Sequence, residues 1–401
     1  MKQKVEKKKV APIKILMGLF VPFILLTIFF SVLLNDATVD VGTGATDGKY
    51  ASVLSGIDGI VEANPRLVDI AMLASHDAVT DKLSPDSPMD YHDRPTVLGK
   101  LDPITGGFQY RFGKTQAVGL DVQLRQGARM FHIKYTDYEG TWYATHAHLS
   151  DTIEAYVMQV LHYLASPEAK GEIVILLWHP MYFGEGVTLD TFHHWLAGVK
   201  LDGKNLYDYV HYGTTNTFDE EGKPGVRIGD LRYNDLTLNG TAPGVVMFDR
   251  REGTRFYEDG MEGTFTDEYM GKFFDMDANA THVWHSRIGQ DTLIEKINAQ
   301  AKIVEESDQW DNKLRMNQTQ ASFSAGGFSD IFIDIGAWSL LRFAKDYNVT
   351  LVNHENFDYW LSVMPVFQVD FVNSNHGDFN NLVNQKIIAY NTALVNSILN
   401  A

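Results

Sequence analysis

The chain has 401 residues, of which 45% are hydrophobic and 21% are charged, the composition of a folded globular protein. Its formal net charge is −17, and six of its lysines precede Asp36, so the remainder is more acidic still and is expected to repel the phosphate backbone of nucleic acids. The chain has no cysteine, which excludes disulfide bonds and thiolate metal sites.

The N-terminal segment predicts export or membrane attachment. Residues 1–14 form a lysine-rich head, and residues 15–34 contain no charge over a length that spans a bilayer as a helix. The positive-inside rule places the head in the cytoplasm. We expect 15–34 to be a transmembrane signal anchor, because no Ala-x-Ala cleavage site is visible; a cleaved signal peptide and a secreted product remain the alternative. Residues 35–64 then form a tether, and residues 65–401 form an extracellular or luminal domain.

Four sequons in that domain predict a glycoprotein if the chain enters a eukaryotic secretory pathway. They begin at Asn239, Asn279, Asn317 and Asn348. Chance occurrence in an asparagine-rich sequence explains them equally well.

From about Leu67 onward, short apolar runs alternate with longer amphipathic segments, which is the pattern of βα units. The expected strands are 68–74, 128–135, 172–178, 244–249, 330–335, 349–353 and 366–372, with a weak one at 282–285. The expected helices are 150–165, 188–199, 290–306, 336–347 and 378–398. Seven or eight strands favour a single distorted (β/α) barrel of the TIM type. Residues 81–119 break the rhythm and are expected to form a long loop over the barrel mouth.

Polar residues with catalytic potential follow the first two expected strands. The first strand ends in Ser75-His76-Asp77, and the second runs from Ala128 to Lys134, with His146 and His148 shortly after it. In a parallel α/β protein such residues converge at the carboxyl ends of the strands. Two histidines there can act as general base and general acid near neutral pH. A helix cap is the alternative role for His76 and Asp77.

These segments resemble the catalytic X domain of phosphatidylinositol-specific phospholipases C, especially the bacterial, metal-independent branch. The resemblance rests on Ala74-Ser-His-Asp-Ala-Val-Thr80, Gln123-Leu-Arg-Gln-Gly-Ala-Arg-Met-Phe131, the segment from His146 to Pro167, Ile173-Val-Ile-Leu176 and Val369-Asp-Phe-Val-Asn373. It covers roughly Leu67 to the C-terminus, although the middle third matches poorly. The resemblance implies a phosphoric diester hydrolase or lyase that acts on a phospholipid or glycosylphosphatidylinositol, without a metal or cofactor.

The resemblance also implies roles for individual residues. His76 would be the general base and His146 the general acid, with His148 as an alternative acid. Asp77 would pair with Lys134, and Asp370 on the last strand would orient the imidazole of His76. The resemblance places Arg250 after the fourth strand, where it would contact the substrate phosphate. Trp178 occupies a position near the expected headgroup site.

Several residues depart from the family pattern. Lys134 replaces the usual arginine, Ala147 follows His146 where glycine is usual, and Trp178-His179 stands where bacterial members often have a lysine. The acidic calcium ligands of the other branch are missing from the second strand, which argues against calcium there. The departures leave open a catalytically weakened barrel that binds lipid headgroups or glycans. A metal phosphodiesterase would need clustered carboxylates at the ends of the first two strands, and the sequence shows none.

Overall fold

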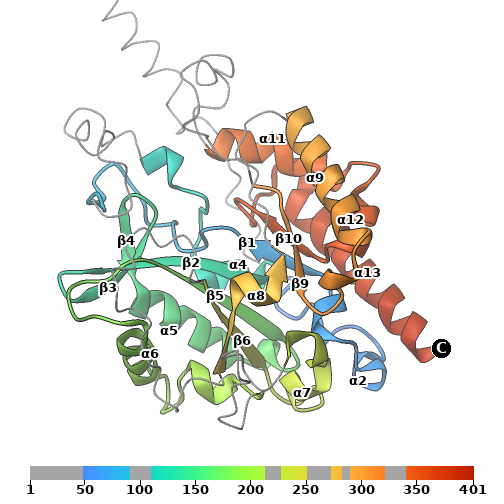
Figure 1. Cartoon of the computed structure of the whole chain (residues 1–401), viewed down its shortest axis with the longest axis horizontal. Coiled ribbons are helices and arrows are strands. Elements are labelled where there is room, and N and C mark those ends of the chain that lie inside the picture. The colour runs from blue at the N-terminus through green and yellow to red at the C-terminus, as the bar shows by residue number, and fades with distance from the viewer. Residues whose placement is uncertain (1–47, 91–109, 213–226, 251–271, 282–289, 321–339) are drawn as a thin grey trace, which may run out of the picture. The chain divides into compact units, whose positions relative to one another are not determined.

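The computed structural model describes residues 48–90, 110–212, 227–250, 272–281, 290–320 and 340–401. Within them, ten strands form one sheet in the order β7-β6-β5-β2-β1-β10-β9-β8, in which every neighbouring pair is parallel (Figure 1). The hairpin strands β3 and β4 extend the end of β2 in antiparallel fashion. The strands are β1 (Met72–Ser75), β2 (Ala128–Tyr138), β3 (Thr141–Thr145), β4 (Leu149–Thr152), β5 (Ile173–Tyr182), β6 (Gly244–Asp249), β7 (Phe273–Asp275), β8 (Ala280–Thr281), β9 (Leu314–Gln318) and β10 (Val366–Val369).

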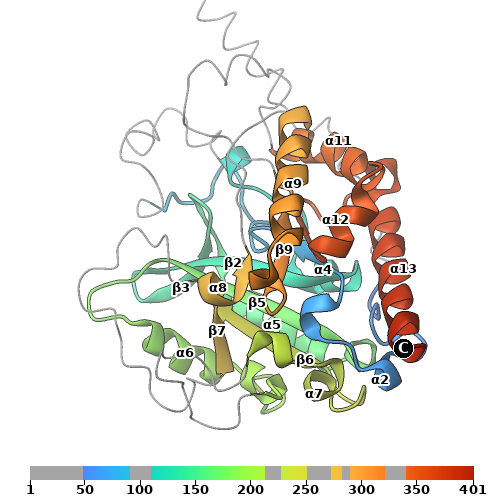
Figure 2. The same ribbon diagram turned by 45° about the vertical axis from the view of Figure 1, so that its right-hand side comes forward.

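Helices pack around this sheet in two groups (Figures 1 and 2). One group, α9, α11, α12 and α13, lies beside β9 and β10, whereas α5 and α6 lie beside β2 and β5. The helices are α2 (Ile60–Ala63), α4 (Leu120–Arg125), α5 (Ile153–Leu164), α6 (Leu189–Gly198), α7 (Tyr233–Thr237), α8 (Met276–Asn279), α9 (Gln290–Glu305), α11 (Leu340–Val352), α12 (Phe357–Val363) and α13 (Phe379–Leu399). Threonine side chains cap the amino ends of α5 and α6, which fixes where these helices begin.

Within the described residues the sheet is a curled half-barrel, which agrees with the predicted distorted (β/α) barrel although no closure is seen there. Its two outer strands, β7 and β8, are consecutive in the chain and are joined by the single turn of α8. No backbone pairing joins them within the residues described. The side chain of Asp275 accepts a hydrogen bond from the backbone amide of Asp277, so a helical turn begins directly after β7.

Most predicted elements are present with shifted ends, and the first and last strands are neighbours, as the expected contact of Asp370 with His76 requires. Met72 pairs with Val366, and Ser75 pairs with Val369. The strand predicted at 349–353 is wrong, because those residues continue α11, whose Leu351 is buried on the same side as Ala344 and Tyr347. The strands predicted at 282–285 and 330–335 lie outside the described residues.

The domain begins earlier than the predicted boundary at residue 65. Tyr50, Leu54 and Ile57, within the predicted tether, are buried in the core. Two buried charges hold this segment. Arg129 at the start of β2 donates to the carbonyls of Tyr50 and Ala51, and Glu172 before β5 accepts from the amide of Leu54. The segment is therefore part of the fold at the amino ends of the strands.

The predicted membrane span at 15–34, with its lysine-rich head, lies outside the described residues. Among the helices that the structure describes, none combines the length and the hydrophobicity needed to cross a membrane.

Candidate active site

The carboxyl end of β1 places His76 and Asp77 between β2 and β10. The amide of His76 still donates to the carbonyl of Val369, 3.0 Å away, so the ladder with β10 extends one residue beyond the strand. Asp77 then takes a left-handed conformation with φ of +40°, which reverses the chain. The amide of Ala78 donates to the carbonyl of His132 at 2.7 Å and ties the turn to β2. This turn, rather than a helix cap, positions the two side chains.

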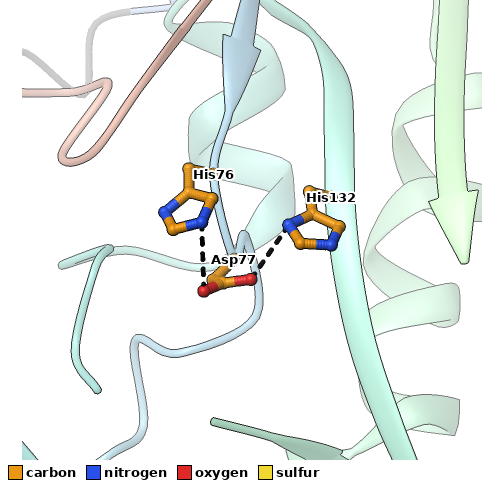
Figure 3. Close-up of side chains that lie close together, drawn as sticks. All are labelled: His76, Asp77 and His132. Atoms are coloured by element: carbon orange, nitrogen blue, oxygen red, sulfur yellow. Dashed lines mark ion pairs between the residues drawn. The ribbon is translucent and has the colours of Figure 1, made fainter. Parts of the chain in front are cut away.

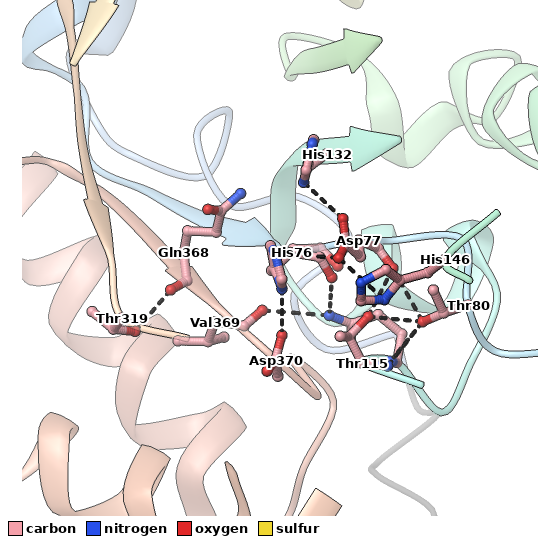
Figure 4. Close-up of polar contacts among 12 residues, drawn as sticks. His76, Asp77, Thr80, Thr115, His132, His146, Thr319, Gln368, Val369 and Asp370 are labelled. Carbon is pink, nitrogen blue, oxygen red and sulfur yellow. Dashed lines mark hydrogen bonds and ion pairs between the residues drawn. The ribbon is translucent and has the colours of Figure 1, made fainter. Parts of the chain in front are cut away.

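Asp77 is the common partner of one lysine and three histidines. Figures 3 and 4 show the histidines around it. Its Oδ2 lies 3.1 Å from Nζ of Lys134 and 3.3 Å from both Nε2 of His76 and Nδ1 of His146. Its Oδ1 lies 2.9 Å from Nδ1 of His132. His132 and Lys134 alternate along β2 and so present their side chains on the same face of the sheet. The carboxylate itself is fully buried.

The cationic surroundings set the charge of Asp77. Burial alone would raise the pKa of this carboxyl group, but His76, Lys134 and the other two imidazoles outweigh burial and hold the pKa well below its ordinary value. Asp77 is therefore an anion at neutral pH. It can hold the ammonium group of Lys134 in place beside the two histidines predicted to be catalytic.

His76 is also bound by a second carboxylate. Its Nδ1 lies 2.8 Å from Oδ1 of Asp370, which follows β10 (Figure 4). Asp370 is buried, and burial raises its pKa despite the neighbouring His76. The amide of Asn348 donates to the carbonyl of Asp370 and fixes the turn. A carboxylate at Nδ1 holds the ring proton there, which leaves Nε2 of His76 as the atom that can accept a proton.

His146 approaches from the loop between β3 and β4. Ala147 has φ of +66°, and this turn directs His146 toward Asp77. Its Nδ1 lies 2.7 Å from the carbonyl oxygen of Gly113, which accepts the ring proton. The rings of His76 and His146 are 6.5 Å apart between centroids and nearly perpendicular. Their side chains are 12% and 21% exposed, so both can be reached from solvent, whereas Asp77 cannot.

Three polar residues for which the sequence predicted no role hold the ends of β1 and β10 in place. The hydroxyls of Thr80 and Thr115 lie 2.8 Å apart, and that of Thr115 also donates to the carbonyl of Asp77. The side-chain amide of Gln116 donates to the carbonyl of His76. All three are buried. Thr115 and Gln116 lie in the predicted loop 81–119, where no periodicity marks them.

A pair of buried histidines lies next to Asp77 on β2 and β5. Nε2 of His132 lies 2.9 Å from Nδ1 of His179. Burial lowers the pKa of His132 to about 4, even though Asp77 opposes the shift. Burial, together with His132 and Arg250, lowers the pKa of His179 well below its ordinary value. Both rings are neutral at neutral pH.

The three remaining candidate residues take different positions. Arg250 follows β6, is half-buried, and is close enough to His179 to affect its pKa. Trp178 is 1% exposed and packs against Tyr135 and Phe192, so it belongs to the core on the helix side of the sheet. His148 is also buried, at 2% exposure, which favours His146 over it as the residue that reaches a substrate.

Among the residues that the structure describes, one group of side chains could hold a metal ion. His76, Asp77 and His132 each offer one ligand atom, and these atoms all lie within 4.8 Å of one another (Figure 3). The ammonium group of Lys134 contacts the same carboxylate. The site therefore already has a positive charge of its own, which a phosphate could use without a metal ion.

Comparison with known proteins gives the same fold. No family model matches the chain. A mutant of the phosphatidylinositol-specific phospholipase C from Staphylococcus aureus superposes with a TM-score of 0.56 at 12% identity, over 86% of this chain and 99% of that one. The phosphatidylinositol-specific phospholipase C from Listeria monocytogenes gives a TM-score of 0.54 at 15% identity, over 85% of this chain and 98% of that one.

A relative with an aligned sequence comes from Trypanosoma brucei brucei. Its variant-surface-glycoprotein phospholipase C is 28% identical over 135 residues, which make up 31% of this chain and 37% of the relative. The aligned part thus spans well under half of either protein. The comparisons confirm the resemblance found in the sequence: the chain has the fold of the bacterial phosphatidylinositol-specific phospholipases C.

Proposed function

We propose that the chain is a phosphodiesterase of the phospholipase C type that cleaves a phospholipid or glycosylphosphatidylinositol phosphodiester. The observation that carries this proposal is the arrangement around Asp77. Two partly exposed histidines face each other across 6.5 Å, and the ammonium group of Lys134 lies on the carboxylate between them. A base, an acid and a cation at one place are what cleavage of a phosphodiester requires.

In the proposed reaction, Nε2 of His76 takes the proton from a substrate hydroxyl, and Asp370 stabilises the imidazolium that forms. The freed oxygen attacks the phosphorus of the same molecule and gives a cyclic phosphodiester. Lys134 stabilises the charge that develops on the phosphoryl oxygens, and Arg250 assists from the end of β6. His146 gives its proton to the leaving alkoxide of the diacylglycerol part.

The relatives support this reaction class. The two bacterial structures are named for phosphatidylinositol and the trypanosome protein for a surface glycoprotein. The first assays should therefore include both phosphatidylinositol and glycosylphosphatidylinositol anchors. We further propose that the enzyme is exported and held at the membrane by residues 15–34, on the grounds of their apolar sequence.

The test is to incubate the chain with radiolabelled phospholipids and glycosylphosphatidylinositol anchors and to identify the released products. We expect one headgroup class to be converted to a cyclic phosphate, and the activity to survive EDTA. Activity that EDTA abolishes and calcium restores would contradict the metal-free mechanism. If the chain binds lipid headgroups but cleaves no phosphodiester, it is a headgroup-binding module and not an enzyme.

A further inference from the structure

One oxygen of Asp77 lacks a suitable partner. Oδ2 accepts a hydrogen bond from Lys134, but Oδ1 is buried and makes no hydrogen bond within the described residues. Within the described residues it contacts Nδ1 of His132, 2.9 Å away, and this contact is an ion pair only when that imidazole is protonated. A buried anionic oxygen without a partner is unfavourable and indicates an unfilled site.

We propose that His76, Asp77 and His132 form a binding site for a first-row transition metal ion such as Zn²⁺, and that the ion inhibits the enzyme. The ligand atoms are Nε2 of His76, a carboxylate oxygen of Asp77 and Nδ1 of His132 (Figure 3). Two imidazole nitrogens and one carboxylate oxygen suit zinc, copper or nickel, whereas calcium and magnesium require oxygen ligands. Three protein ligands leave a fourth position open for water.

Both imidazoles already have the outer partners that metal-binding histidines need. The other ring nitrogen of His76 is bonded to Asp370, and that of His132 is bonded to His179. Such partners fix the ring orientation and the tautomer. With the metal on Nδ1, the proton of His132 moves to Nε2 and is donated to Nδ1 of His179. The proton of His179 then moves to its own Nε2, which has no hydrogen-bond partner in the described structure.

The local charge also permits a cation. Two carboxylates, Asp77 and Asp370, lie within contact of the histidines, and Lys134 neutralises only one of them. The ion would use Oδ1 of Asp77, on the side away from the ammonium group.

Inhibition follows from the use of His76, and this part rests on the proposed function. The nitrogen that would bind the metal is the one that would take the proton from the substrate. An enzyme that works without a metal would thus lose activity when zinc is added, and EDTA would restore it. His132 has no part in the proposed reaction, so it offers a way to separate metal binding from catalysis.

The experiment measures Zn²⁺ binding to the full chain by titration calorimetry, together with its activity with and without zinc. We expect one ion per chain. His132→Asn should weaken binding by at least ~10-fold, since loss of a ligand should cost no less than loss of an outer partner. Inhibition of the remaining activity of this variant should require correspondingly more zinc than inhibition of the parent. His162→Asn, which changes an exposed histidine of α5, should leave binding and activity unchanged.

A second measurement needs no variant. X-ray absorption on the zinc-loaded parent chain should detect two imidazole ligands and at least one oxygen ligand. Fewer than two imidazoles, or equal zinc affinities for the parent and His132→Asn, would overturn the proposal. Zinc bound through two imidazoles by a chain that cleaves no phosphodiester would refute the proposed function and leave the metal site standing.

Discussion

Replacing Asp77 with asparagine tests the carboxylate that joins the candidate catalytic groups. The substitution keeps the shape and removes the charge. Lys134 then remains as an ammonium group that is only 15% exposed and has lost its partner at 3.1 Å. At that distance and an effective dielectric constant of about 20, the lost attraction is about 5 kcal/mol, part of which is offset because a buried carboxylate no longer has to be desolvated. We expect a loss of about 3 kcal/mol in the free energy of unfolding.

The loss of activity should be larger than the loss of stability suggests. His76, His146 and Lys134 all contact Oδ2 of Asp77, so one substitution loosens the base, the acid and the cation together. Misplacement of such groups by about 1 Å costs on the order of 100-fold, and we expect kcat to fall at least that much. Asp235→Asn, which makes the same change on the exposed face of α7, should alter neither quantity.

The assays are urea unfolding followed by circular dichroism and cleavage of the identified substrate at saturation. A double-mutant cycle sharpens them. Lys134→Met in the Asp77→Asn background should restore part of the lost stability, because the uncompensated ammonium group is gone. If Asp77→Asn keeps its stability within ~1 kcal/mol and its kcat within ~3-fold, Asp77 does not organise the site.

Three further changes give separate outcomes. His76→Ala and His146→Ala should each lower the rate at least ~100-fold. A substrate with a nitrophenolate leaving group should rescue only His146→Ala, because nitrophenolate leaves without receiving a proton. Full activity of both variants on every phosphodiester tested would exclude the mechanism. Lys134→Arg should keep or raise the rate if this residue binds phosphate, whereas a change in unfolding free energy alone would make it a structural ion pair. The pKa of His132 is lowered from 6.5 to about 4 in the folded chain, so between these pH values the unfolded chain binds a proton at this residue and the folded chain does not. The free energy of unfolding should therefore fall by up to about 3 kcal/mol as the pH is lowered from 6.5 to 4. In EDTA, urea unfolding of His132→Asn should show a smaller fall over that range, and an identical fall would refute the assignment.

The sequence predicted the centre of the site better than its edges. The run that ends in Ser75 is apolar throughout and is buried in the sheet, so the convergence of His76 and Asp77 with Lys134 could be expected from strand ends alone. The position of Asp370 depended on β10 lying beside β1, which the resemblance implied. Thr115 and Gln116 could not be predicted, because their contacts depend on the path of a loop without periodic pattern.

Two of the wrong predictions have physical reasons that can be read from single residues. Trp178 precedes His179 on β5, and neighbouring residues of a strand face opposite ways. Since His179 bonds to His132 inside the sheet, Trp178 has to face the helices, where it meets Phe192 of α6. At 349–353, β-branched residues suggested a strand. The apolar positions of α11 are spaced as on one face of a helix, and the packing of that face against the core outweighs the intrinsic β-propensity of these residues.

Buried ionisable side chains at the two ends of β2 and β5 differ in how they are satisfied, and this difference agrees with the position of the candidate site. At the amino ends, Arg129 and Glu172 bond to each other at 2.7 Å. Their other polar atoms bond to the backbone of the N-terminal segment and, through Nη1 of Arg129, to the carbonyls of Leu124 and Ala128. At the carboxyl ends, Oδ1 of Asp77 and Nε2 of His179 are buried without hydrogen-bond partners in the described structure. Folding alone favours the first arrangement and opposes the second. Buried polar groups without hydrogen-bond partners are expected where a ligand supplies the missing contact. These two groups lie at the end of the sheet where His76, His146 and Lys134 meet.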